Sequence, residues 1–187
     1  MCGLAGYIGN KNISERKVKK ILKIMNNRGP DSQNSLKFSF LKKNLYFFST
    51  RLSIVDRFSR SNQPMSFENL SIAFNGEIYN TNELKKIIRR KKVKLKTKSD
   101  TEIILRMFQI YGDRCAQYLN GMWSFAIFDR KKNKLFLSRD RIGEKPIFYF
   151  KKNNQFYFGS QTSYIRKLAS DYNILNDKKI ISFLNYG

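Results

Sequence analysis

Residues 1–9, MCGLAGYIG, decide the fold assignment, because they put a cysteine at position 2 and a run of small and apolar residues directly behind it. The uninterrupted run over 3–9 predicts a buried strand that begins at the start of the chain. An initiator methionine is normally removed before a small residue, and its removal would give Cys2 a free α-amine. That amine titrates at about 7.7–8.0, so the thiol would carry its own base. Cys2 is therefore a candidate nucleophile, with a small packed side chain as the alternative.

Length and composition exclude several kinds of fold, catalytic site and metal site. The 187 residues suit one domain with its own core, and 41% hydrophobic residues with 16 Phe and 10 Tyr argue against disorder. The sequence contains no histidine and only two cysteines, Cys2 and Cys115. A Ser-His-Asp triad, a Cys-His pair, a His-ligated metal, a thiolate zinc site and a disulfide scaffold are therefore excluded. We expect no metal site, and any proton transfer at neutral pH must use a group other than imidazole.

The chain carries a formal net charge of +23, which raises the question of a polyanionic partner. The densest basic run is residues 85–98, KKIIRRKKVKLKTK, with apolar residues spaced as on the inner face of a helix in its first part. A solvated helix end and loop is the favoured interpretation, and nucleic acid is not an expected partner. The abundance of Lys, Asn, Ile, Phe and Tyr also fits a coding bias toward A and T. Neither a membrane-length apolar run nor a basic signal segment is present, which predicts a cytoplasmic protein without a membrane partner.

The pattern along the chain predicts blocks of strands and helices. Ser14 can cap a helix over 15–26, in which Ile21 and Met25 share an apolar face, and further helices start near 82, at Asp100 or Thr101, and near 162. Strands are predicted at 35–40, 44–49, 52–55, 70–74, 122–129, 134–139, 146–150 and 155–160. Asn75-Gly76 is expected to form a sharp turn after the strand at 70–74. Because the blocks do not alternate strictly, the pattern favours the α+β class.

Nine segments in order carry a resemblance to a known family: MCGLAGYIG, NRGPDSQ, TRLSIVD, NQPM, FNGEIYN, SDTEIIL, LNGMWSFAIFD, LSRDRIGEKPIFY and FGSQTSYIRKL. From end to end the sequence resembles the glutaminase domain of glutamine-dependent asparagine synthetases, a class II glutamine amidotransferase domain. The resemblance implies a four-layer αββα sandwich of the N-terminal-nucleophile hydrolase type. It also implies one domain over 1–187, with about 170–187 beginning the connection to a synthetase domain.

The resemblance also assigns roles to individual residues. Cys2 matches the family nucleophile, which attacks the glutamine carboxamide, and Asn75 with Gly76 matches the oxyanion-hole pair. Arg51 matches the partner of the substrate carboxylate, Asp100 meets the substrate ammonium with Glu77 beside it, and a helix N-cap is a further role open to Asp100. The pocket lining expected from the family is Leu52, Ser53, Ile54 and Val55.

Other family positions are interpreted as structural. Arg28 and Asp31 belong to the RGPD turn, Asp140, Arg141 and Lys145 form a turn outside the reacting groups, and Cys115 is a packed thiol. The sequence departs from the family pattern at four positions outside the proposed reacting groups, which are Asn27, Ser49, Thr50 and Gln161.

The family continues into an ATP-dependent domain with a phosphate-binding loop, and these 187 residues contain no such loop. The expected partners are therefore glutamine, a C-terminal or separate synthetase domain and, as one option, a second copy of the chain. No cofactor is expected here, since ATP and Mg would bind only in the synthetase domain. Two alternatives stay open: a glutaminase domain serving another acceptor, such as a sugar, and a non-catalytic basic binding module.

Overall fold

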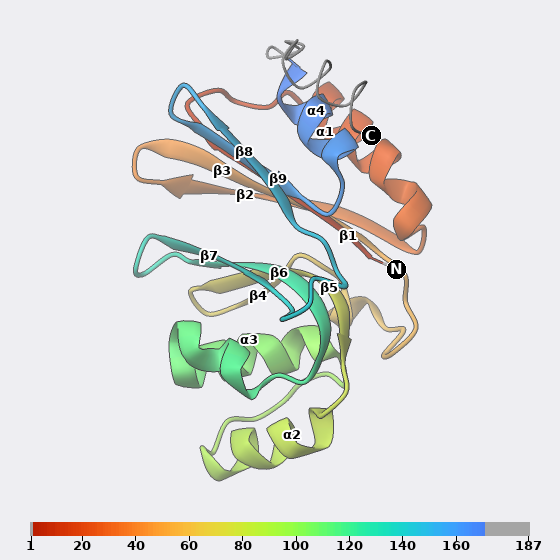
Figure 1. Cartoon of the computed structure of the whole chain (residues 1–187), viewed down its shortest axis with the longest axis vertical. Helices are drawn as coiled ribbons and strands as arrows, with labels where there is room; N and C mark the ends of the chain where they lie inside the picture. Colours follow the sequence, from red (N-terminus) through yellow and green to blue (C-terminus); the bar gives the residue numbers. More distant parts are fainter. Residues whose placement is uncertain (1, 171–187) are drawn as a thin grey trace, which may run out of the picture.

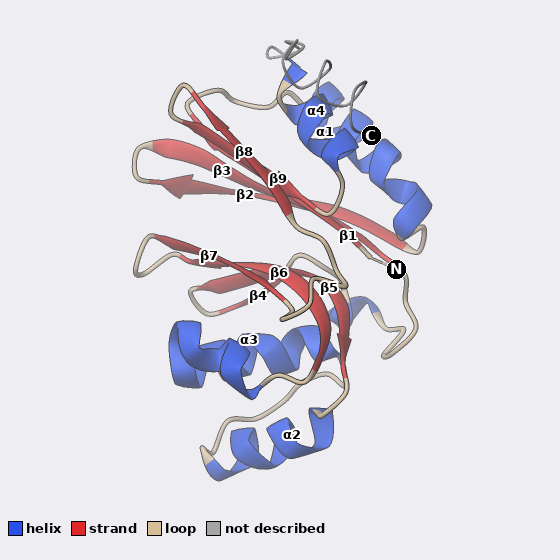
Figure 2. Cartoon of the chain, viewed as in Figure 1, coloured by secondary structure: helices blue, strands red, loops and turns tan. Residues whose placement is uncertain are grey.

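Two antiparallel sheets lie face to face in the computed structural model, which describes residues 2–170, and helices cover the outer side of each sheet (Figures 1 and 2). The layers follow the order helix, sheet, sheet, helix. This arrangement confirms the expected α+β sandwich. The expected connection to a further domain, at about 170–187, lies outside the described residues apart from Ser170.

The N-terminal strand is buried, as the opening residues predict, and it lies in the middle of the five-stranded sheet. This strand, β1, pairs with β3 on one side and β9 on the other, in the order β2-β3-β1-β9-β8, and all seven of its residues are buried. The five strands are β1 (Gly3–Gly9), β2 (Ser32–Phe40), β3 (Lys43–Arg51), β8 (Phe148–Lys152) and β9 (Gln155–Gly159).

The second sheet has four strands in the order β4-β5-β6-β7. They are β4 (Met65–Phe67), β5 (Leu70–Ile78), β6 (Gly121–Asp129) and β7 (Lys134–Arg139). Strand β5 pairs with β6 over its whole length, from Leu70 opposite Asp129 to Ile78 opposite Gly121. Beyond the short β4, the other edge of β5 has no partner strand in the described chain.

Helices α1 (Glu15–Met25) and α4 (Thr162–Leu168) cover the five-stranded sheet, whereas α2 (Thr81–Arg90) and α3 (Asp100–Tyr111) lie below the four-stranded one (Figure 1). The predicted cap of α1 is confirmed, since the Ser14 hydroxyl accepts a hydrogen bond from Lys17 N. Short 3-10 segments complete the described secondary structure at Asn26–Arg28, Ser59–Ser61 and Gly112–Tyr118. None of the helices in residues 2–170 combines the length and apolar character needed to cross a bilayer.

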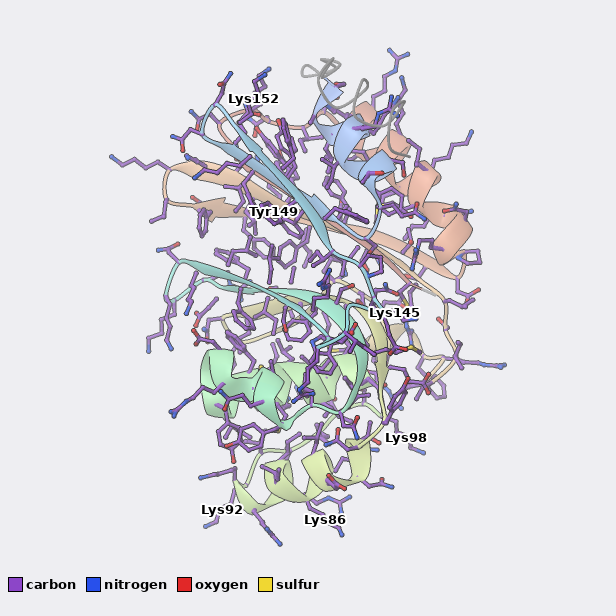
Figure 3. The ribbon with its side chains drawn as sticks, viewed as in Figure 1. Lys86, Lys92, Lys98, Lys145, Tyr149 and Lys152 are labelled. Atoms are coloured by element: carbon purple, nitrogen blue, oxygen red, sulfur yellow. The ribbon has the colours of Figure 1, made fainter. Side chains whose placement is uncertain are left out.

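Three apolar clusters hold the layers together. One lies between α1, α4 and the five-stranded sheet, and a second lies between α2, α3 and the four-stranded sheet. The third fills the space between the sheets, where the small side chains Ala73 and Ala126 meet larger ones such as Leu4, Phe47 and Phe158. The basic run at 85–98 contributes Ile88 to the second cluster. Its residues Lys86 and Lys92 are exposed at the end of the molecule formed by α2, at the bottom of Figure 3.

Two local predictions are wrong. Residues 52–55 form an irregular loop, since Ile54 and Val55 are 72% and 50% exposed and no strand lies beside them. Asn75-Gly76 forms no turn, because β5 continues through both residues to Ile78, paired with β6. In the same region the cap of α3 is Ser99, whose hydroxyl accepts from Glu102 N, so Asp100 is not the N-cap but the first helical residue.

Candidate active site

Cys2 lies immediately before β1, at the end of the space between the two sheets. Side chains alternate along a strand, so Cys2 is directed to the same side as Leu4, which belongs to the cluster between the sheets. The Cys2 Sγ lies 3.9 Å from the carbonyl oxygen of Leu52. Burial raises the pKa of Cys2, while the hydrogen bond to Leu52 and the charge of Arg51 act in the opposite direction. The thiol therefore favours its protonated form and needs a base to become a nucleophile.

The Cys2 thiol borders a cavity of about 140 Å³. Most of the lining comes from three segments that are far apart in the sequence. Its walls come from the loop after β3, from the free edge of β5 and from the start of α3. The lining residues are Cys2, Arg51, Leu52, Ile54, Val55, Gln63, Phe74, Asn75, Gly76, Glu77, Ser99, Asp100, Thr101, Met122 and Lys145.

Asn75 is fully buried in this wall, and its side chain is unsatisfied. Within the described residues, neither Nδ2 nor Oδ1 reaches a hydrogen-bond partner. A buried polar atom without a partner costs about 1–3 kcal/mol. The Asn75 amide is therefore placed to bind a polar group that enters the cavity.

The free edge of β5 supplies a row of backbone N–H groups. Phe74 N donates to Gln63 Oε1 at 2.6 Å, and Ile78 N donates to Asp100 Oδ2 at 2.9 Å. Both groups point away from β6, because hydrogen bonding alternates along an antiparallel pair. The same alternation directs the N–H of Gly76, midway between them, toward this edge. Because Gly76 also lines the cavity, its N–H and the Asn75 amide provide two neighbouring hydrogen-bond donors for a group in the cavity.

Gly76 cannot be replaced by a residue with a side chain without moving the backbone. Its φ of +153° is rare for residues with a side chain, and a Cβ there would lie 2.1 Å from Met122 O and 2.7 Å from Trp123 Cα. Close contact between β5 and β6 thus requires glycine here, which is a structural reason for the Asn-Gly sequence.

Asp100 and Glu77 place negative charge at one end of the cavity. Burial raises the pKa of Asp100, the hydrogen bond from Ile78 N opposes that rise, and the nearby charge of Glu77 adds to it. Two carboxyl groups in one partly buried site make a suitable position for an ammonium group. Its positive charge would offset both the desolvation of Asp100 and the repulsion between Asp100 and Glu77.

Arg51 lies at the end of β3 and is only 4% exposed. Its guanidinium holds the following loop: Nη2 donates to Val55 O at 2.9 Å and to Asp56 O at 2.5 Å, and Nη1 donates to Asn62 Oδ1 at 3.1 Å and to Phe58 O at 3.4 Å. A guanidinium has five N–H donors, and these bonds involve only Nη1 and Nη2. Arg51 therefore shapes the loop while it borders the cavity, a role that the sequence pattern does not predict.

Three of the four loop residues expected to line the cavity do so: Leu52, Ile54 and Val55. The predicted pocket residue Ser53 does not line it. Its backbone N–H donates to Asp31 Oδ2 at 2.6 Å, and it borders a second, more open hollow that Leu52 and Ile54 also line. Asp31 thus fixes the loop from outside, which agrees with its structural interpretation.

Two turn residues also hold the site in place. Arg28 Nε donates to Cys2 O at 3.2 Å, so its side chain positions the backbone of Cys2. Asp140 accepts from Trp123 N, Glu144 N and Lys145 N. Burial would raise the pKa of Asp140, but these N–H groups outweigh it and lower the pKa.

Sequence reasoning missed several lining residues. Gln63 joins two walls, because its Oε1 accepts from Phe74 N and its Nε2 donates to Thr101 Oγ1 at 3.1 Å. Lys145, expected only as part of a turn outside the reacting groups, also lines the cavity, because the turn fixed by Asp140 buries this residue to 8% exposure in the wall; its position is labelled in Figure 3. Both residues fall in the NQPM and RDRIGEKP segments, so the motifs marked the regions but not the contacts.

Comparison with solved structures supports the fold. The chain matches the glutamine phosphoribosylpyrophosphate amidotransferase of B. subtilis with a TM-score of 0.67 at 16% identity, over 90% of this chain and 44% of that one. A structure described as the allosteric regulatory enzyme of purine biosynthesis gives a TM-score of 0.69 at 15% identity, over 90% and 43% of the two chains.

Comparison with curated sequences is more specific. Asparagine synthetase [glutamine-hydrolyzing] 3 of Bacillus subtilis is 34% identical over 168 residues, which cover 86% of this chain and 26% of that protein. Asparagine synthetase [glutamine-hydrolyzing] 1 of the same organism is 33% identical over 181 residues, covering 93% and 28%. The chain spans only about a quarter of the length of these two relatives. The family model for the glutamine amidotransferase domain matches residues 1–186, and the chain belongs to this family.

Proposed function

We propose that this domain hydrolyses the side-chain amide of glutamine to glutamate and ammonia through a thioester on Cys2. The observation that carries the proposal is the buried, unsatisfied amide of Asn75 in the cavity that also contains the Cys2 thiol. Amide hydrolysis requires a nucleophile and a group that stabilises the oxyanion, and these two residues supply both.

The first half of the reaction forms the thioester. After removal of the initiator methionine, the α-amine of Cys2 takes the thiol proton, and sulfur attacks the carboxamide carbon. The developing oxyanion receives hydrogen bonds from Asn75 Nδ2 and Gly76 N–H. When the intermediate collapses, the C–N bond breaks and the amine returns the proton to the leaving nitrogen, which departs as ammonia.

The second half consumes one water molecule. Its oxygen attacks the thioester carbon, one proton passes through the amine to the Cys2 sulfur, and glutamate is released. The same oxyanion site serves both steps, because each passes through a tetrahedral intermediate on the same carbon.

The polar groups of the cavity suit the amino-acid end of glutamine. Asp100 and Glu77 would bind the α-ammonium group. The α-carboxylate would be attracted by the positive charge of Arg51 and would accept from its Nε–H, the one donor not used by the loop. Leu52 and Val55 would cover the aliphatic part. Since these groups are charged and the cavity is small, we expect strong selectivity for a free amino acid over a peptide-bound glutamine.

The ammonia would be passed to a synthetase domain. We base this on the two Bacillus subtilis relatives, which are described as glutamine-hydrolysing asparagine synthetases and extend far beyond the matched region. On this proposal ATP and Mg are needed only by the synthetase domain, the glutaminase domain spans 1–187, and the reaction takes place in the cytoplasm. A different acceptor, such as a sugar, would leave the glutaminase site unchanged.

The proposal is tested by measuring glutamate released from glutamine by the purified chain, together with a mass spectrum that reports whether the initiator methionine has been removed. Replacement Cys2→Ala is expected to abolish release. Cys115→Ala is the matched control, because that second thiol is buried in the core and should not be required. Activity that survives Cys2→Ala would contradict the mechanism.

A further inference from the structure

The loop over residues 52–58 forms one wall of the cavity, yet apolar packing does little to hold it. Ile54 is 72% exposed, Val55 50% and Phe58 67%. A segment with so little buried apolar surface gains little stability from the hydrophobic effect. Hydrogen bonds must therefore determine where this wall lies.

Asp56 makes the bond that joins this loop to the opposite wall. Its Oδ2 accepts a hydrogen bond from Lys98 N at 2.7 Å, and its side chain is only 1% exposed. Arg60 adds an ion pair at 3.5 Å from a side chain that is 53% exposed. The pKa of Asp56 is lowered, chiefly by the Lys98 N–H. At neutral pH this carboxylate is therefore charged and fixed in position.

The wall formed by the start of α3 is held by the same hydrogen bond between Lys98 N and Asp56 Oδ2. Lys98 immediately precedes Ser99, Asp100 and Thr101, all of which line the cavity. The two preceding N–H groups, of Lys96 and Thr97, donate to the buried carboxylate of Glu102. Three successive backbone N–H groups of this basic segment are thus held by two acidic side chains.

The backbone of Asp56 is fixed from the other direction. Its φ is +51°, in the left-handed region, and its carbonyl accepts from Arg51 Nη2. One residue therefore connects Arg51, on the carboxylate side of the cavity, with the segment that carries Asp100, on the ammonium side.

We propose that Asp56 is a positioning residue for the substrate: it sets the separation of the two cavity walls, and so the affinity for the amino-acid end of the ligand, without touching it. The substrate identity rests on the proposed function. A loss of the Asp56–Lys98 contact should weaken glutamine binding while the reacting groups at Cys2, next to β1, and at Asn75, within β5, keep their geometry.

Two variants separate the hydrogen bond from the backbone conformation. Asp56→Gly tolerates a positive φ but removes the acceptor, whereas Asp56→Asn tolerates the same φ and retains an acceptor for Lys98 N. We expect Asp56→Gly to raise the KM for glutamine about tenfold or more, the effect of losing one hydrogen bond to a charged group, with kcat changed much less. Asp56→Asn should recover most of that affinity. Arg60→Gln, which removes only the exposed ion-pair partner, is the matched control and should behave as the native chain.

A second readout does not depend on catalysis. Trypsin cleavage after Arg57 and Arg60, followed by mass spectrometry, reports the order of the loop, and cleavage within α2 serves as the internal reference. Asp56→Gly should accelerate cleavage of the loop but not of α2. If the native chain lacks glutaminase activity, the proposed function fails and the cleavage rates alone decide the role of Asp56. Unchanged loop cleavage, an equal increase at all sites, or a fall in kcat at constant KM would overturn the proposal.

Discussion

Replacement of Asn75 by alanine separates a catalytic amide from a structural one. In a structural role, a fully buried Asn would make hydrogen bonds that the variant loses, and stability would fall sharply. Here both amide atoms are unsatisfied within the described residues, so their removal relieves a penalty of about 1–3 kcal/mol for each atom. Truncation also removes packing worth roughly 2–3 kcal/mol, at the lower end of large-to-small substitutions. The relief for the two atoms offsets or exceeds the lost packing, so the free energy of unfolding should fall by no more than about 1 kcal/mol.

The effect on catalysis should be much larger. Loss of one oxyanion donor typically lowers kcat by about 10²–10³, equivalent to about 2.7–4 kcal/mol of transition-state stabilisation. We therefore expect Asn75→Ala to lose no more than about 4 °C in melting temperature, since about 1 kcal/mol corresponds to 2–4 °C in a domain of this size. Its glutamate release should fall at least 100-fold, as judged from that typical loss.

Ser71 provides the control for this comparison. It lies on the same strand and the same face as Asn75, is equally buried, and its hydroxyl pairs with Ser66 Oγ at 2.8 Å. Ser71→Ala should lose about 1 kcal/mol of stability and no activity. Thermal unfolding and a coupled glutamate assay on both variants complete the test. The reasoning is refuted if Asn75→Ala unfolds more than about 12 °C earlier, beyond what truncation alone allows, or if it retains native kcat.

Four other outcomes are expected. Gly76→Ala should prevent stable folding, because its Cβ would lie 2.1 Å from Met122 O; circular dichroism of the soluble fraction checks this. Burial raises the pKa of Asp100, so the folded state binds this proton more tightly than the unfolded chain and the ionised carboxylate opposes folding at pH 7. Asp100→Asn should therefore raise the melting temperature at pH 7, an advantage that shrinks as the pH falls through the raised pKa, while it raises the KM for glutamine. The kcat/KM should fall as the pH drops below the range of the Cys2 α-amine, about 7.7–8.0, and a pH-independent rate would exclude that base. Iodoacetamide at pH 8 should label Cys2 and spare Cys115, whose pKa burial raises to about 12; peptide mapping distinguishes the two.

The sequence predicted the fold well where one face of an element is buried. The apolar run behind Cys2 became the central strand β1, and the helical spacing around Ile21 and Met25 became the buried face of α1. In both cases the side chains that determine the pattern are those that pack in the core, so periodicity alone carries the information.

The errors arose where residues serve the cavity instead of the core. Ile54 and Val55 are β-branched and adjacent, as in a strand, but they are largely exposed and border the cavity. Asn75-Gly76 has the composition of a turn, yet the glycine is needed for close contact between β5 and β6. Local propensity does not distinguish these roles, because they depend on tertiary contacts, such as that of Gly76 with Met122 and Trp123 and that of the Arg51 guanidinium with Val55 O.

The resemblance located the candidate site more completely than the local patterns did. It assigned Cys2, Arg51, Asn75 and Asp100 to one site, and the structure places all four around one cavity. It did not reveal the hydrogen bonds that hold the walls, such as those of Gln63, since those depend on side-chain geometry that a motif does not encode.

The separation of Cys2 and Asn75 onto different sheets has a consequence for how a newly made chain becomes competent. Each sheet has its own helices and its own apolar cluster, but the proposed nucleophile belongs to one half and the proposed oxyanion donor to the other. Neither half holds both groups, so on the proposed mechanism a chain whose sheets have formed but not yet packed against each other would be inactive. During refolding, glutaminase activity would therefore appear only when the two sheets pack together. It would appear later than the circular dichroism signals of helix and strand formation.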